Sequence, residues 1–175
     1  MCIRDRHKGR RLVLSKNKEK ASVIQQCFKF DNTNHFNNKT LVIATQPIFN
    51  KLKGKLKDNG FFYDIYSRLI LESKRKGFTP ILKLHPKESE SDYLSFKEKG
   101  VAFLSNKLPL EIYLLSSKNK VNIISINSSA GMGIEEHCEI YKLVPDSKVH
   151  NLESILIELE KKQDSLQDLI SLQLS

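Results

Sequence analysis

The chain has 175 residues, of which 39% are hydrophobic and 28% charged, and this balance excludes a disordered or collagen-like protein. No apolar run approaches the roughly 20 residues that a membrane-spanning helix needs, and the basic N-terminus lacks the apolar segment of a secretory signal. The three cysteines lie far apart. Their spacing predicts a reducing compartment and no bound metal.

The net charge of +9 is unevenly distributed along the chain. Residues 1–87 carry 20 Lys and Arg against 6 Asp and Glu, a net charge of +14, whereas residues 88–175 carry 9 against 14, a net charge of −5. The basic half indicates either an anionic partner or a solvated lysine-rich surface. Because the aromatic residues do not follow the pattern of an RNA-binding strand, we predict no nucleic-acid partner. A basic RNA-binding module remains the non-enzymatic alternative.

Residues 1–39 are polar and irregular, so we predict a leader there and a folded domain over residues 40–175. From residue 41 onward, short β-rich runs alternate with helical patterns. We expect strands at 41–45, 80–85, 101–105, 121–127 and 139–144, with helices at 61–77, 91–100, 109–117, 131–137, 151–162 and 163–174. This alternation predicts an α/β Rossmann-like fold with a parallel sheet.

A parallel sheet of this type binds ligands beyond the carboxyl ends of its strands. The polar residues that directly follow the predicted strands are therefore candidates for a binding site, namely Thr45, Gln46, His85, Ser128 and Ser129. A histidine or a pair of serines at such a place can hold a phosphate, but an ordinary loop histidine and an ordinary serine helix cap fit the pattern equally well.

His85 is followed by Pro86, which ends the strand and leaves the imidazole at the ligand edge. Lys83, two residues earlier, lies on the same face and would add a second phosphate partner. Glu111 opens a predicted helix, where it either favours the helix dipole or binds ribose hydroxyls. The Gly-Met-Gly sequence that begins at Gly131 matches neither a dinucleotide-binding nor a Walker motif, so we predict no cofactor.

Five segments in this order resemble the carboxyl-terminal, nucleotide-binding half of bacterial sialyltransferases. They are ATQP (44–47), DNG (58–60), KLHPKE (83–88), LPLEIYLL (108–115) and INSSA (126–130). The series is most similar to the lipooligosaccharide sialyltransferases, glycosyltransferase family 52, and more distantly similar to the bacterial polysialyltransferases. The resemblance covers residues 41–144 and implies one half of a GT-B architecture, in which two Rossmann-like domains enclose the active site.

The resemblance also implies roles for individual residues. His85 and Pro86 would contact the phosphate of CMP, and His85 would protonate it as it leaves. Ser128 and Ser129 would hold the same phosphate, while Glu111 would bind the ribose.

The family's acidic-acidic-glycine motif reads Asp58-Asn59-Gly60 in this chain, with an amide at the second position. The resemblance implies that Asp58 is the base that deprotonates the acceptor hydroxyl. Gly60, Thr45 and Gln46 would then lie near the donor. A simple turn is the alternative reading of this Asp-Asn-Gly sequence.

The implied activity is an inverting, metal-independent transfer of sialic acid from CMP-sialic acid to a cell-surface glycan such as lipooligosaccharide. The implied partners are this donor and a glycan acceptor, and the implied location is the cytoplasm. Peripheral association with the inner membrane and a homodimer are both compatible with this function. A glycerophosphotransferase of the teichoic-acid or capsule type is the enzymatic alternative, because it resembles the chain at the His-Pro and Ser-Ser positions.

About 40 residues precede the first predicted strand, whereas a further Rossmann-like domain would need about 100. In addition, the first six residues, MCIRDR, resemble translated sequencing-adapter sequence. We therefore predict that the chain is a fragment that lacks the acceptor-side domain.

Overall fold

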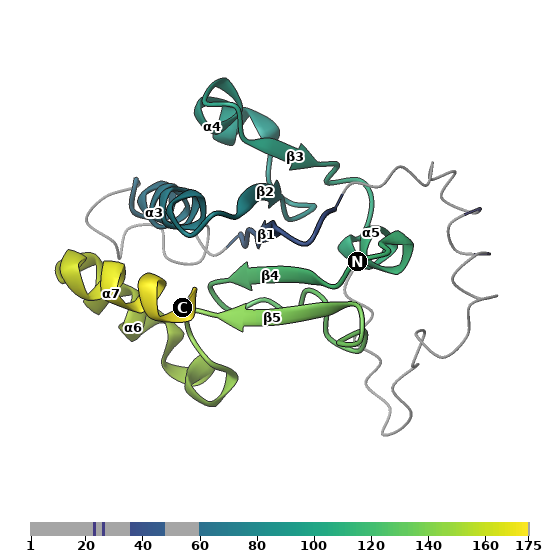
Figure 1. Cartoon of the computed structure of the whole chain (residues 1–175). Helices are drawn as coiled ribbons and strands as arrows, with labels where there is room; N and C mark the ends of the chain where they lie inside the picture. Colours follow the sequence, from purple (N-terminus) through teal and green to yellow (C-terminus); the bar gives the residue numbers. More distant parts are fainter. Residues whose placement is uncertain (1–22, 24–25, 27–35, 48–59, 175) are drawn as a thin grey trace.

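A computed structural model describes residues 23, 26, 36–47 and 60–174 of the chain. Within them, a five-stranded sheet has the order β3-β2-β1-β4-β5, and every neighbouring pair of strands is parallel (Figure 1). The strands are β1 (Thr40–Ala44), β2 (Thr79–Lys83), β3 (Ala102–Leu104), β4 (Val121–Ser125) and β5 (Cys138–Lys142).

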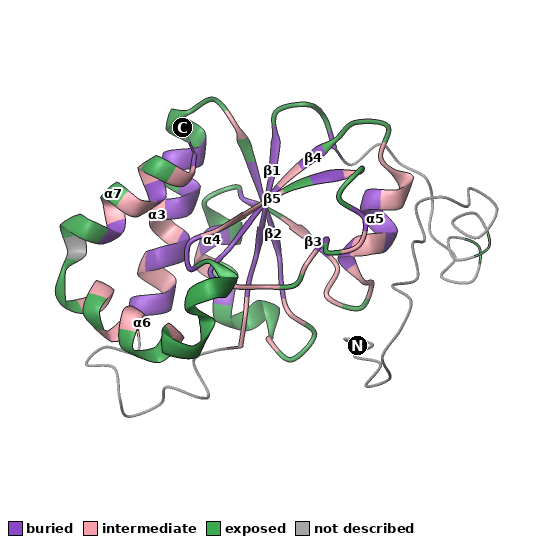
Figure 2. Cartoon of the chain, turned by 90° about the horizontal axis from the view of Figure 1, so that it is seen from below, coloured by how far each residue is buried: buried purple, intermediate pink, exposed green. Residues whose placement is uncertain are grey.

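The sheet is sandwiched between two unequal helical layers, as Figure 2 shows. One face is covered by α3 (Phe61–Arg75), α4 (Leu94–Glu98), α6 (Leu152–Lys161) and α7 (Gln163–Gln173), and the other by α5 (Leu110–Ser116). Two short 3-10 helices, η2 (Glu90–Tyr93) and η3 (Asp146–Asn151), precede α4 and α6.

The central strand β1 shows why these residues form a sheet that is covered on both faces. Its sequence TLVIA is buried at every position, as is typical of a parallel strand with helices on either side. Leu41 and Ile43 pack in the core beneath α3, whereas Val42 and Ala44 pack in the core beneath α5. The period-two alternation of the strand thus divides its side chains between two cores.

The predicted α/β Rossmann-like fold is confirmed, and each predicted strand overlaps an observed one. The helix predicted at 131–137 is wrong, because this segment forms a series of turns between β4 and β5. Gly131 and Gly133 both have positive φ values, of 79° and 91°, which a right-handed helix does not contain. The predicted boundary of the leader, at residue 39, precedes the start of β1 by one residue, but most of residues 1–39 lie outside the described part.

The strand order creates a switch point between β1 and β4. The chain runs outward from β1 to β2 and β3, and α5 then carries it back across the other face to β4, on the opposite side of β1. In sheets of this type the crevice at the carboxyl ends of the two diverging strands is the usual place for a ligand. The residues that follow β1 and β4 are therefore the first place to look for a site.

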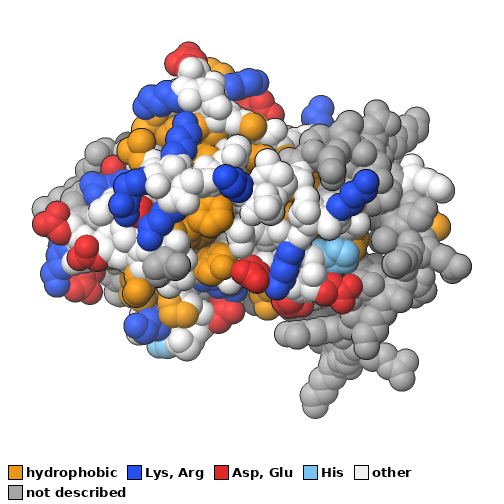
Figure 3. Space-filling model, in the orientation of Figure 1, with side chains coloured by type: hydrophobic (Ala, Val, Ile, Leu, Met, Phe, Trp, Pro, Cys, Tyr) orange, Lys and Arg blue, Asp and Glu red, His pale blue; other side chains and the backbone are white. Residues whose placement is uncertain are grey.

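Exposed Lys and Arg side chains lie on α3, which belongs to the basic half, and on α4, which follows it, and they mingle with acidic side chains on the face shown in Figure 3. Lys97, for example, lies 3.7 Å from the carboxylate of Glu90. In the described residues, no helix is both long and apolar enough to cross a bilayer.

Candidate functional site at the carboxyl edge of the sheet

The register of the sheet aligns the ends of its three central strands. Ala44, the last residue of β1, lies beside Lys83 of β2 and Ser125 of β4. The structure therefore places Thr45, Gln46, His85, Ser128 and Ser129 along the same edge. Their roles in binding remain predictions, but their placement shows that two loops flank the end of β1.

The first of these, the His-Pro loop (residues 84–88), is held by the carboxylate of Glu88. Its Oε2 accepts hydrogen bonds from the His85 main-chain N–H at 3.0 Å and from the Thr45 hydroxyl. Its Oε1 accepts one from the Tyr93 hydroxyl at 2.7 Å. The Thr45 oxygen in turn accepts from the same His85 N–H at 3.0 Å, so one main-chain amide is shared between two acceptors.

The imidazole of His85 has a defined protonation pattern. Its Nδ1 accepts a hydrogen bond from the main-chain N–H of Lys87 at 3.1 Å, so this nitrogen carries no proton. The neutral ring must therefore carry its proton on Nε2. Burial of this half-buried ring lowers its pKa, and the charge of Glu88 partly opposes that effect. The geometry thus favours a neutral histidine that donates from Nε2.

Lys83, the predicted second phosphate partner, is buried, with only 6% of the residue exposed. Its Nζ donates to the main-chain oxygen of Leu84 at 3.2 Å. Burial lowers the pKa of Lys83, while the negative charge of Glu111 on α5 raises it. The positive charge of Lys83 therefore lies beneath the carboxyl edge of the sheet, on the side that faces Glu111 of α5.

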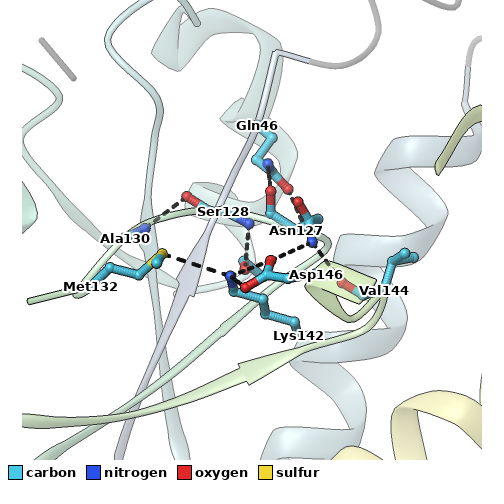
Figure 4. A network of polar contacts seen from close by, with 9 residues as sticks. Gln46, Asn127, Ser128, Ala130, Met132, Lys142, Val144 and Asp146 are labelled. Atoms are coloured by element: carbon cyan, nitrogen blue, oxygen red, sulfur yellow. Dashed lines mark hydrogen bonds and ion pairs between the residues drawn. The ribbon is translucent and has the colours of Figure 1, made fainter. Parts of the chain in front are cut away.

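The second loop, the Ser-Ser loop (residues 126–137), is tied to β1 through Gln46. The Gln46 side chain accepts from the main-chain N–H of Asn127 at 2.6 Å and donates to the main-chain oxygen of the same residue. Figure 4 shows this pair of contacts, which spans the switch point between β1 and β4. The main-chain N–H of Gln46 donates to the buried Tyr66 hydroxyl at 3.0 Å, which fixes the start of this bridge.

Within the Ser-Ser loop, several main-chain amides are already satisfied locally. The N–H of Ser128 donates to the buried Ser125 hydroxyl at 3.0 Å, and the N–H of Ala130 donates to the Ser128 hydroxyl at 3.1 Å. Because turns and not a helix follow the serines, they do not act as the helix cap that the sequence left open. The hydroxyl of Ser128 is half-buried and that of Ser129 is exposed, so both can donate to a phosphate at this edge.

The side chain of Asn127 extends the network to the end of β5, as Figure 4 also shows. Its Nδ2 donates to the main-chain oxygen of Val144 at 2.8 Å and to Asp146 at 3.1 Å. The ammonium of Lys142 lies 2.7 Å from the Asp146 carboxylate, and this contact holds the pKa of Asp146 below its usual value. A shallow groove of about 460 Å³ lies beside this ion pair at the edge of β5 and does not include His85 or Ser128.

The remaining predicted residues have different outcomes. Glu111 lies in the first turn of α5 and is half-buried, and Pro86 is exposed beside His85. Gly60 is the N-cap of α3, with an ordinary φ of −76°, so this position does not depend on the special freedom of glycine. Asp58, the predicted base, lies outside the described residues.

Glu88 is the functional candidate that sequence reasoning missed. The sequence HPKE contains the signal. Glu88 lies three residues after His85, where the predicted strand ends, and an acidic side chain at that spacing can accept a hydrogen bond from the main chain of its own turn. The buried hydroxyls of Tyr66 and Tyr93 are a second signal, because a tyrosine at a core position needs a polar partner. Without the three-dimensional structure, neither signal shows which residues form hydrogen bonds with each other.

The fold and this edge define a Rossmann-like α/β protein with two anchored polar loops at its switch point. The model of the alpha-2,8-polysialyltransferase (POLYST) family matches residues 10–136, which is more than half of the chain. The chain therefore belongs to the alpha-2,8-polysialyltransferase family and is a glycosyltransferase of the sialyltransferase type.

This match supports the resemblance to polysialyltransferases, which was the more distant of the two. The resemblance to lipooligosaccharide sialyltransferases stays a prediction. It begins well before residue 41 and includes the His-Pro loop and most of the Ser-Ser loop. Neither a curated protein nor a solved structure matches the chain significantly.

Proposed function

We propose that the chain binds CMP-sialic acid at the carboxyl edge of the sheet and serves its transfer to a cell-surface glycan such as lipooligosaccharide. The observation that carries this proposal is the convergence of the two anchored loops at the switch point. One loop presents the Nε2–H of His85, and the other presents the hydroxyls of Ser128 and Ser129. A phosphate between them would accept hydrogen bonds from both sides.

In the proposed reaction, a hydroxyl of the acceptor glycan attacks the anomeric carbon of sialic acid from the face opposite CMP. The bond from that carbon to the phosphate oxygen breaks, and CMP leaves with the bonding electrons, so the configuration is inverted. Donors placed where this negative charge develops stabilise the transition state. His85 and the two serines are such donors, and the buried charge of Lys83 acts from below.

Hydrogen bonds from His85 and the serines, together with the positive charge of Lys83, would stabilise the leaving phosphate without a divalent cation, so we propose a metal-independent reaction. The contact of His85 Nδ1 with the Lys87 N–H supports one change to the role implied by the resemblance: we propose that a neutral ring stabilises the leaving phosphate by a hydrogen bond from Nε2. Glu111, near the start of α5, is the proposed ribose ligand. Asp58 is the proposed base, which takes the proton of the acceptor hydroxyl.

Thermal unfolding with CMP and CMP-sialic acid tests the donor site. Binding to the folded state should raise the melting temperature by mass action. His85→Ala should lose most of this shift, whereas His150→Ala, at an exposed position of η3, should retain it. A chelator should leave the shift unchanged.

An unchanged shift in His85→Ala would contradict the proposal, as would a chain that neither ligand stabilises. Stabilisation by CDP-glycerol in place of CMP-sialic acid would favour the glycerophosphotransferase alternative. These outcomes separate a failure of the site from a wrong choice of donor.

A further inference from the structure

The carboxylate of Glu88 gathers donors from three separate elements. They are the hydroxyl of Thr45 after β1, the main-chain N–H of His85 after β2, and the hydroxyl of Tyr93 in η2. Thr45 is 3% exposed and Tyr93 is 8% exposed, so water competes little for these contacts. Hydrogen bonds to a charged acceptor are about twice as strong as neutral ones.

The main chain of Glu88 is anchored as well. Its N–H donates to the main-chain oxygen of His85 at 2.9 Å, which closes the turn. Its own main-chain oxygen accepts from the side chain of Asn106 at 3.2 Å, in the loop that follows β3. Glu88 therefore connects the ends of β1, β2 and β3 through one residue.

The direction of the His85 imidazole depends on this anchoring. The carboxylate fixes the His85 main chain from one side, and Lys87 N–H fixes Nδ1 from the other. With both ends held, the Nε2–H has a single direction. If the carboxylate were lost, the turn could rotate and Nδ1 could lose its donor, since both belong to the same short segment.

We propose that Glu88 is a positioning residue, which holds His85 so that its Nε2–H faces the phosphate of the donor nucleotide. This inference rests on the proposed function for the identity of the phosphate, but its effect on His85 exists without any ligand. Glu88 itself does not touch the reacting atoms. Its role is to keep one tautomer and one orientation of the imidazole.

The test compares Glu88→Gln with Glu90→Gln, which makes the same change two residues later at an exposed position. Nitrogen NMR of the histidine-labelled chain, without ligand, reports the tautomer of His85. The wild type and Glu90→Gln should show one Nε2–H tautomer, whereas Glu88→Gln should show a mixture. Affinity for CMP should fall about tenfold in Glu88→Gln, the size of one lost hydrogen bond to a charged group, and stay within about twofold in Glu90→Gln.

Two further variants keep the inference testable if Glu88→Gln does not fold. Tyr93→Phe removes one donor to the carboxylate while it keeps the ring that packs on Phe96. Thr45→Val removes another donor at a conserved volume. Each should give a smaller change in the His85 tautomer than Glu88→Gln, in the same direction.

An unchanged His85 tautomer in Glu88→Gln would overturn the inference, even if the melting temperature fell, because a merely structural residue would behave in this way. A chain that does not bind CMP but shows the tautomer change would leave Glu88 as the positioning residue and refute the proposed function instead. The ligand-free NMR measurement thus distinguishes the two failures.

Discussion

The two loops at the switch point are anchored in physically different ways, although the residues that hold them, Thr45 and Gln46, are neighbours directly after β1. Thr45 reaches toward β2 and joins the His-Pro loop through a carboxylate, Glu88. Gln46 reaches toward β4 and joins the Ser-Ser loop through neutral amide contacts with Asn127. The first anchor depends on charge, and the second depends on shape and amide geometry.

This difference indicates what each loop is built to do. A carboxylate that holds the main chain of a histidine defines the direction of a proton donor. The contacts between Gln46 and Asn127, together with the turns at Gly131 and Gly133, fix the shape of the Ser-Ser loop. The His-Pro loop should therefore be sensitive to polarity, and the Ser-Ser loop should be sensitive to volume.

The largest effect should come from added volume in the Ser-Ser loop. A Cβ at Gly131 would lie 2.9 Å from both Cys138 Sγ and Ile123 Cδ1, and the φ of 79° is unfavourable for alanine. Gly131→Ala should therefore cost about 2–5 kcal/mol of unfolding free energy, from backbone strain and overpacking together. Urea denaturation measures this cost.

The control is Gly133→Ala, where φ is 91° but nothing lies within 4 Å of the added Cβ. Strain alone should cost about 1–2 kcal/mol there. Equal losses in the two variants would show that packing does not define this loop.

The next effect should come from the amide bridge. Gln46→Met keeps the length of the side chain but leaves the main-chain N–H and oxygen of Asn127 without this partner. Unfolding free energy should fall by about 1–3 kcal/mol, the cost of unsatisfied polar groups. Gln167→Met, at a half-buried position of α7 with one long hydrogen bond of 3.5 Å, should change it by less than about 0.5 kcal/mol. If both variants lose the same amount, the bridge across the switch point contributes nothing specific.

The carboxylate anchor should respond to the loss of a single hydroxyl. Thr45→Val removes the donor to Glu88 and one of the two acceptors of the His85 N–H, at a conserved volume. We expect a loss of about 1 kcal/mol in unfolding free energy. Thr45→Ser keeps the hydroxyl and should keep most of that free energy, so a larger loss in the serine variant would show that the methyl group matters more than the hydrogen bonds.

The same contrast explains how far sequence reasoning reaches in this chain. Apolar runs such as LVIA and IISI predict the parallel sheet, and a parallel sheet aligns Thr45, His85 and Ser128 at one edge. The period-two pattern also assigns Lys83 to the same face of its strand as His85. It does not show that Lys83 is buried, because this depends on how α5 packs.

The anchors themselves could not be predicted from local sequence. Glu88 meets Thr45 and Tyr93 only because β1, β2 and η2 converge, and no spacing along the chain encodes that meeting. The helix expected after Ser129 failed for a related reason. Its apolar and acidic residues fit a helix, but two glycines with positive φ turn the segment back toward β5.

The smallest expected effect is a pH dependence of the unfolding free energy that comes from His85, the proposed hydrogen-bond donor of the His-Pro loop. Burial lowers the pKa of His85 below the value of about 6.5 expected in the unfolded chain. Between the lowered pKa and 6.5 the unfolded state binds more protons than the folded state, so the unfolding free energy rises with pH across this window. This contribution of His85 to the unfolding free energy is complete above pH 6.5 and is lost as the pH falls through the lowered pKa.

His85→Asn tests this pH dependence, because it keeps an acceptor for the Lys87 N–H but does not titrate. The other histidines are unchanged in this variant. Urea unfolding of both chains between pH 5 and pH 8 should therefore give a steeper rise for the wild type, and parallel curves would mean that His85 is not held as a neutral donor.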